Sequence, residues 1–279
     1  FGMIGCGKNQ VLKKENVNET NQEQATENKE TAEEQQENTN NDTEEQSQSQ
    51  IDYINIAPEE VKIPILMYHS ISDEDPSNNL LVPPAMFEEQ MAWLEANNFT
   101  AMNMDEALEA MRTGKVPKRP VVITFDDGYA NNYTSAFPSL KNHKLKATFF
   151  VITDGVDNGY YMSSDNLKEM QEAGMSIENH TANHLELNNL SKTDAYESIK
   201  RAQDYLRNVI GSDGNYLCYP VGKYNDETIQ IEEELGIKAA VTTQGGFASI
   251  NDGLHTLKRV RISPMSIEGF ASIFSEYIN

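Results

Sequence analysis

Cysteine is almost absent from this chain, because its 279 residues contain only Cys6 and Cys218. A framework of several disulfides and a structural zinc knuckle are therefore both excluded. Long apolar runs are also absent, since none reaches the roughly 18 residues that a membrane-spanning helix needs. Basic residues are scarce: 22 lysines and arginines stand against 44 acidic residues, and the formal net charge is −22. Without a basic patch to neutralise phosphates, we expect no nucleic-acid partner.

The first six residues form a short apolar stretch that ends in a cysteine, Phe1-Gly-Met-Ile-Gly-Cys6. This stretch resembles the end of a bacterial lipoprotein signal, in which a small residue precedes a lipid-modified cysteine. The resemblance implies that residues 1–6 are a signal remnant and that Cys6 carries the lipid. The protein would then be anchored to the extracellular face of the cytoplasmic membrane, in the cell envelope. The alternative is an arbitrary truncation, and membrane fractionation of Cys6→Ala would separate the two.

Residues 7–60 are predicted to be a disordered, acidic tether. Residues 1–60 carry 14 acidic and 4 basic side chains, and residues 7–50 include only five apolar ones. The remainder is mostly glutamate, glutamine, asparagine, threonine and lysine. Such a segment buries too little apolar surface to offset the entropy of ordering it.

Residues 61–279 are predicted to be one α/β domain in which strands alternate with helices. The run 121–125 is β-branched and aromatic, as in a strand buried on both faces. Further strands are expected at 63–68, 147–152, 175–178, 216–219, 239–243 and 257–262, and helices at 86–97, 105–112, 133–143, 164–174, 191–210, 227–235 and 266–278. Ser164 and Ser191 are expected to cap the helices that they begin. This alternation indicates parallel βαβ units, in either a (β/α) barrel or a doubly wound open sheet. In both, the carboxyl edge of the strands carries the chemistry.

Three polar clusters follow predicted strands. Asp126-Asp-Gly128 comes directly after the buried strand, where two adjacent carboxylates need a cation or a proton to compensate them. His180 and His184 are four residues apart and can supply two imidazoles to one metal ion. Tyr219-Pro-Val-Gly-Lys-Tyr224 is the third cluster. Taken singly, these segments also fit a surface turn, a chance histidine pair and an ordinary loop.

The order and spacing of the three clusters resemble the polysaccharide deacetylases of carbohydrate esterase family 4, which contain a NodB homology domain. The strand before His69 is similar to that of the subgroup related to poly-N-acetylglucosamine deacetylases. The resemblance covers residues 61–279 and implies a distorted (β/α) barrel. By resemblance, the metal ligands are Asp127, His180 and His184. Asp126 is then the catalytic base, and the backbone N–H of Val221 stabilises the oxyanion.

The sequence departs from the family pattern at three places, one of which is that the aspartate and tryptophan of the family's fourth motif are not recognisable. Cys218 stands where the family has an arginine that orients the base. Arg259 or Arg261 could take over the role of that arginine; the alternative is that these two residues take part in a surface ion pair. The histidine that normally acts as the acid is missing, and His69 and His255 compete for that role. We expect His69, because it ends a strand at the catalytic edge, where a nearby aspartate would favour its protonated form. Further residues expected in the substrate cleft are Tyr129, Tyr219, Pro220, Tyr224, Arg259 and Arg261.

The resemblance implies a metal-dependent hydrolase that removes acetyl groups from N-acetylglucosamine units of a polysaccharide. Peptidoglycan, poly-N-acetylglucosamine and a chitin-like polymer are the candidate substrates, and Zn²⁺ is the expected metal, with Co²⁺ or Ni²⁺ as alternatives. Two other functions remain open: an inactive or weakly active glycan-binding protein with an adhesive role, and an O-acetyl esterase of the xylan type. We expect a monomer.

Overall fold

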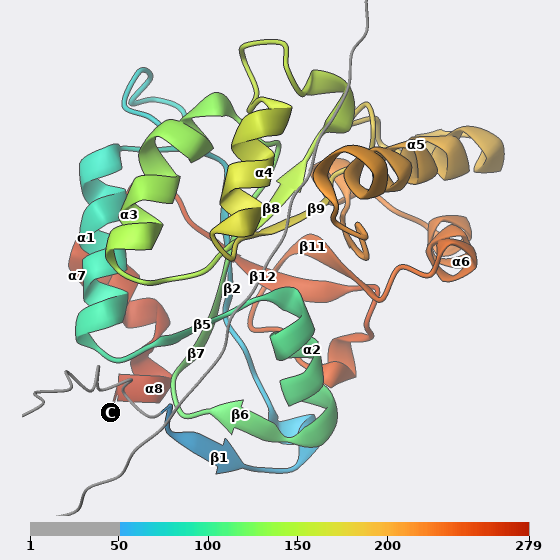
Figure 1. Ribbon diagram of the computed structural model, residues 1–279. Coiled ribbons are helices and arrows are strands. Elements are labelled where there is room, and N and C mark those ends of the chain that lie inside the picture. Colours follow the sequence, from blue (N-terminus) through green and yellow to red (C-terminus); the bar gives the residue numbers. More distant parts are fainter. Residues whose placement is uncertain (1–50, 279) are drawn as a thin grey trace, which may run out of the picture. The chain divides into compact units, whose positions relative to one another are not determined.

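Seven parallel strands form a closed barrel in the computed structural model, which describes residues 51–278 (Figure 1). Neighbouring strands follow the order β2-β12-β11-β10-β9-β8-β7, and β7 pairs with β2 to close the ring. The predicted (β/α) barrel is therefore confirmed, and the doubly wound open sheet is excluded. The strands are β2 (Ile65–Tyr68), β7 (Pro120–Phe125), β8 (Thr148–Val151), β9 (Ser176–Asn179), β10 (Tyr216–Cys218), β11 (Ala239–Gly245) and β12 (Leu257–Arg261).

Helices surround the barrel, and shorter strands lie outside its ring (Figure 1). Strand β5 (Thr100–Met102) adds to β7 outside the ring, while β3 (Ser70–Ile71) pairs with β4 (Leu81–Val82). The helices are α1 (Pro84–Ala96), α2 (Met104–Thr113), α3 (Phe137–Asn142), α4 (Ser164–Glu172), α5 (Lys192–Tyr205), α6 (Asp226–Leu235), α7 (Ile267–Ile273) and α8 (Ser275–Ile278).

The barrel strands are apolar because both of their faces are covered. All six residues of β7 are buried, and so are all four of β2 and of β8. In a parallel barrel, one face of each strand meets the interior and the other meets the helices, which accounts for continuous rather than alternating apolar runs. Parallel pairing also brings every carboxyl end to one edge, and this edge carries the site.

Side-chain caps determine where several helices begin. The Ser191 hydroxyl accepts a hydrogen bond from the Asp194 backbone N–H, as predicted from the sequence. After Tyr205 the chain continues through a π-helical turn to Ile210, which is the predicted end of this helix. The expectation that Ser164 caps its helix is wrong by one residue: Ser163 is the cap, because its hydroxyl accepts from the Asn166 N–H.

The ordered domain begins before the predicted boundary at residue 61. Strand β1 (Tyr53–Asn55) pairs antiparallel with β6 (Lys115–Pro117), and a 3-10 turn follows at Pro58–Glu60. The prediction of a disordered tether is therefore wrong for residues 51–60. Their backbone finds partners in the domain, since the Ile56 N–H donates to the Gly114 carbonyl. The rest of the predicted tether and the predicted lipid site at Cys6 lie outside the described residues.

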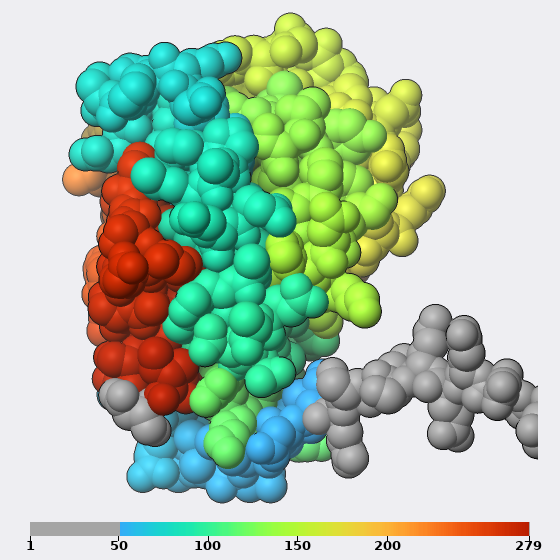
Figure 2. All heavy atoms as spheres, turned by 90° about the vertical axis from the view of Figure 1, so that its left-hand side faces the viewer, coloured from blue at the N-terminus to red at the C-terminus, as the bar shows by residue number. Residues whose placement is uncertain are grey.

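The end of the described chain packs against its first long helix. Figure 2 shows residues of α7 and α8 side by side with α1, and α1 and α7 are in contact. Trp93 of α1 lies at the centre of this contact, with its ring 5.8 Å from that of Phe270 and 5.4 Å from that of Phe274. Among residues 51–278, no helix combines the length and apolar character that a membrane crossing requires.

Candidate active site and metal centre

The three predicted metal ligands meet at the carboxyl edge of the barrel. Asp127 follows β7, whereas His180 and His184 follow β9. The Asp127 Oδ1 atom lies 3.2 Å from His180 Nε2 and 3.4 Å from His184 Nε2. Asp127 and His180 are buried, and His184 is partly exposed. One carboxylate and two imidazoles converge from two strand ends, so one cation can contact all three.

The hydrogen bonding of His180 fits a cation between these groups. Its Nδ1 atom lies 2.8 Å from the Cys218 carbonyl oxygen, which can only accept, so Nδ1 carries the proton. In the neutral ring Nε2 is then an unprotonated acceptor that faces the carboxylate of Asp127. Two acceptors so close need either a proton on Nε2 or a cation between them, so the arrangement fits a metal ion. The backbone carbonyl of Cys218 thus orients a predicted ligand, a role that the sequence did not indicate.

The backbone at this edge is strained in the segments that hold the ligands. Asp127 has φ 72°, Thr181 has φ 65° and His184 has φ 56°, values that non-glycine residues rarely adopt. Buried Asn179 supports one of these turns, because its Oδ1 atom accepts a 2.7 Å hydrogen bond from the Thr181 N–H. Gly128 permits the other turn: with φ 83°, an added Cβ would lie 2.9 Å from the Val151 side chain. Sequence spacing found the ligands but missed Asn179.

Asp126, the predicted base, is clamped by Arg259 from β12. The guanidinium donates from Nη1 to Oδ1 and from Nη2 to Oδ2, each over 2.7 Å. It also donates from Nε to the Thr242 carbonyl, and its Nη2 lies 3.2 Å from the Cys218 sulfur. Arg259 is 1% exposed, so the alternative of a surface ion pair is wrong for it. Arg261, the other substitute considered, is exposed.

Arg259 also determines the charge of the base. Burial alone would raise the pKa of Asp126, but the guanidinium holds that pKa well below its usual range. The carboxylate is therefore ionised at neutral pH. Its Oδ2 atom lies 3.8 Å from Nε2 of His69, the predicted acid.

Replacing Arg259 with methionine should lower the free energy of unfolding by about 3–5 kcal/mol, because the Asp126 carboxylate would stay buried without its cation. Arg261→Met is the matched control, since an exposed substitution changes stability by no more than about 0.5 kcal/mol. Urea denaturation of both variants measures the difference. Coincident unfolding curves for wild type and Arg259→Met would contradict this account of the clamp.

His69 lies where the sequence placed it, but its protonation differs from the expectation. Its side chain is 13% exposed and close to Asp126. Nearby aspartates were expected to favour the protonated ring. Burial instead lowers the pKa of His69, and it outweighs the opposing charges of Asp126 and Asp127, while Arg259 and Arg261 lower the pKa further. This expectation was wrong because it left out desolvation.

The rival acid, His255, does not point into this cluster. Its Nδ1 atom lies 2.6 Å from buried Glu232 on α6. The loop before β12, to which it belongs, is at the opposite end of that strand from the catalytic edge.

The predicted cleft residues, and Val221 as the predicted oxyanion donor, differ in how exposed they are. Tyr129 lies two residues after Asp127, and Val221 is 55% exposed in a turn with φ 56°. Tyr219 is instead 1% exposed, and its hydroxyl donates to the His255 carbonyl, away from the catalytic edge. This corrects its prediction as a cleft residue. Pro220 is buried at the start of the same turn, whereas Tyr224 stacks on Tyr219 at 4.5 Å.

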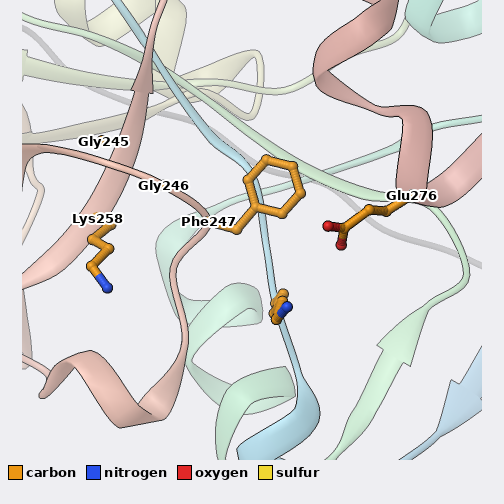
Figure 3. A pocket seen from close by; sticks show the side chains of 6 residues that line it. Gly245, Gly246, Phe247, Lys258 and Glu276 are labelled. Carbon is orange, nitrogen blue, oxygen red and sulfur yellow. The ribbon is translucent and has the colours of Figure 1, made fainter.

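The protein also has a cavity of about 360 Å³, which Figure 3 shows. It is lined by Lys62, Gly245, Gly246, Phe247, Lys258 and Glu276. None of these residues was predicted to be functional, and none belongs to the Asp/His cluster. The candidate active site is therefore the cluster at the carboxyl edge of the barrel and not this cavity.

Comparisons with known proteins point to one family. The family model described as polysaccharide deacetylase matches residues 113–240. YxkH of Bacillus subtilis, whose name places it among polysaccharide deacetylases, is 40% identical over 218 residues, which is 78% of this chain and 76% of YxkH. The poly-beta-1,6-N-acetyl-D-glucosamine N-deacetylase of Staphylococcus epidermidis is 28% identical over 230 residues, which is 73% of this chain and 80% of that enzyme.

A solved structure matches the fold closely. The Streptococcus pyogenes deacetylase PplD, in complex with acetate, has a TM-score of 0.75 and 36% sequence identity, and the match covers 77% of this chain and 99% of that one. A closed parallel barrel with an Asp-Asp pair and two histidines at its carboxyl edge defines a (β/α)-barrel hydrolase. This chain belongs to the polysaccharide deacetylase family.

Proposed function

We propose that this protein is a metal-dependent deacetylase that hydrolyses the N-acetyl groups of N-acetylglucosamine units in a polysaccharide. The observation that carries the proposal is the convergence of Asp127, His180 and His184 beside the clamped carboxylate of Asp126. The substrate class is taken from the Staphylococcus epidermidis relative, which is named for this reaction on poly-beta-1,6-N-acetyl-D-glucosamine.

The Asp/His cluster would hold the metal ion. Its one-oxygen, two-nitrogen donor set suits Zn²⁺ and also accepts Co²⁺ or Ni²⁺. Three protein ligands leave coordination positions open, as in catalytic rather than structural sites. When bound there, such a cation supplies Lewis-acid chemistry, which makes the amide carbonyl more electrophilic and water more acidic.

The protein's own groups then divide the proton transfers between them. Asp126, ionised and held in one orientation by Arg259, accepts the proton of the attacking water. The backbone N–H of Val221 donates a hydrogen bond to the developing oxyanion. His69 donates a proton to the departing nitrogen, which is a poor leaving group as an anion. The products are acetate and a glucosamine residue with a free amine.

Acetate release from a panel of purified glycans tests this function. We expect metal-loaded protein to release acetate from poly-N-acetylglucosamine, peptidoglycan or chitin oligomers, and to act more slowly on O-acetylated xylan. A preference for the xylan would favour the O-acetyl esterase. Binding of the glycans without acetate release under any metal would favour the adhesive role.

The proposed place of action is the outer face of the bacterial cytoplasmic membrane. This proposal depends on the signal-like residues 1–6 and on Cys6 as the lipid attachment site. A tether after an anchor would let the domain reach glycan beyond the membrane surface. Cys6→Ala should then leave the membrane fraction, while wild type should remain in it.

A further inference from the structure

Two adjacent tyrosines lie in the loop between β8 and α4, and the proposed reaction does not use them. Tyr160 is 66% exposed, which is the largest value among the exposed large apolar and aromatic residues in the described part of the chain. Tyr161 is half-buried, and burial together with the charge of Asp127 raises its pKa. Tyr161 therefore lies within electrostatic reach of a predicted metal ligand.

The backbone of this loop is fixed to both ligand-bearing segments. At its start, the Ile152 N–H donates to the Asp127 carbonyl over 3.3 Å, and the Asp154 N–H donates to the Ala182 carbonyl over 2.9 Å. Farther along, the Ala130 N–H donates to the Tyr160 carbonyl over 3.0 Å. A movement of the loop would break these bonds. The two tyrosines are thus held in place relative to Asp127 and the histidines.

Local contacts orient the two side chains. The Asn158 Oδ1 atom accepts from the N–H of Tyr160 over 2.9 Å and of Tyr161 over 3.1 Å. Gly155 makes room for the Tyr161 ring, since an added Cβ would lie 2.5 Å from Cδ2 of that ring. An exposed aromatic side chain on such a loop loses little conformational freedom when a ligand binds.

The rings form a small aromatic group with Tyr129, the residue that follows Asp127 and Gly128. Tyr129 and Tyr161 stack with centroids 5.6 Å apart and planes 18° apart. Tyr160 stands perpendicular to both, at 5.5 Å from Tyr129 and 5.1 Å from Tyr161. Two of the rings support each other, and most of Tyr160 remains open to solvent.

We infer that Tyr160 and Tyr161 form a second sugar subsite, which binds the ring next to the N-acetylglucosamine unit being deacetylated. A pyranose ring has apolar C–H faces and a hydroxylated rim. A tyrosine matches it, because its apolar ring packs against a face while its hydroxyl stays in water. The inference rests on the proposed function and extends it: the enzyme should prefer oligomers to a single sugar.

The test compares wild type with Tyr160→Ala on N-acetylglucosamine and its β-1,6-linked dimer and tetramer. We expect wild type to show a kcat/KM that rises with chain length. Tyr160→Ala should raise KM for the tetramer about tenfold and change kcat less than about twofold, because the lost contact binds ground state and transition state alike. Tyr160→Phe keeps the ring and should behave like wild type.

Tyr53→Ala is the matched control, since Tyr53 is a 45% exposed tyrosine on β1, far from the strand ends that carry the site. Its KM should equal that of wild type. Calorimetric binding of the tetramer should show the same tenfold loss for Tyr160→Ala. Equal affinity of wild type and Tyr160→Ala, or no binding by wild type, would overturn the subsite. Absence of acetate release with intact tetramer binding would instead refute the proposed reaction.

Discussion

Single alanine substitutions of Asp127, His180 or His184 are expected to weaken divalent-metal binding by more than about 100-fold and to remove acetate-releasing activity. The physical reason is that each residue supplies one of only three protein ligand atoms, which lie within 4.8 Å of one another. Loss of an outer partner of a ligand already costs about 10- to 100-fold in such sites. Titration calorimetry with Zn²⁺ and elemental analysis measure metal binding directly.

The control for these variants is His143→Ala, which removes a histidine that contacts Glu88 and Glu95 instead of the site. Its metal content should match that of wild type. In wild type, a strong chelator should abolish activity, and added Zn²⁺ or Co²⁺ should restore it. Full activity after prolonged chelation, in protein that contains no metal, would refute the assignment.

His69→Ala should lower kcat by about 100-fold or more, in the range that general acid catalysis supplies, while metal content stays unchanged. His69 is the one histidine near Asp126 that is not a predicted metal ligand, with 3.8 Å between Nε2 and Oδ2. The expected loss is in kcat because the proton is needed only as the carbon–nitrogen bond breaks. Steady-state kinetics with metal analysis of the same samples makes the measurement.

The matched variant is His255→Ala, whose ring contacts Glu232 and should leave kcat nearly unchanged. Normal kinetics for His69→Ala together with a large loss for His255→Ala would reverse the assignment of the acid.

The pH profile provides an independent check on His69. An acid must hold its proton, so activity should fall as the pH rises through the pKa of His69, and burial lowers that pKa. A lowered pKa reduces the protonated fraction at neutral pH but makes the imidazolium a stronger donor. Wild type should therefore show a declining limb on the basic side, and the residual activity of His69→Ala should lack it.

The ligands of the site could be found from sequence because they follow strands of unmistakable pattern. The run 121–125 has the pattern of a strand covered on both faces, and Asp126-Asp127 follows it directly. Parallel strands end at one edge, so His180 and His184, after another strand, had to lie near those carboxylates. Local pattern together with the geometry of parallel sheets was sufficient here.

The N-terminal boundary of the domain was harder to predict from the sequence. Residues 51–60 do contain three isoleucines and a tyrosine, unlike residues 7–50, but β1 is only three residues long. This strand forms because it pairs with β6, some sixty residues farther along the chain, and the local sequence does not predict that pairing.

The sequence by itself determined the alternation of strands and helices and the metal-ligand candidates, but its residue pattern fitted both a barrel and an open sheet. Only the tertiary structure decided that Arg259 and not Arg261 clamps Asp126, a contact between residues 133 positions apart. It also decided that the Tyr219 hydroxyl points to the His255 carbonyl, and that burial outweighs neighbouring charge at His69. The reason is that closing the barrel sets which side chains meet across its interior and how far water is excluded, and neither quantity is local in sequence.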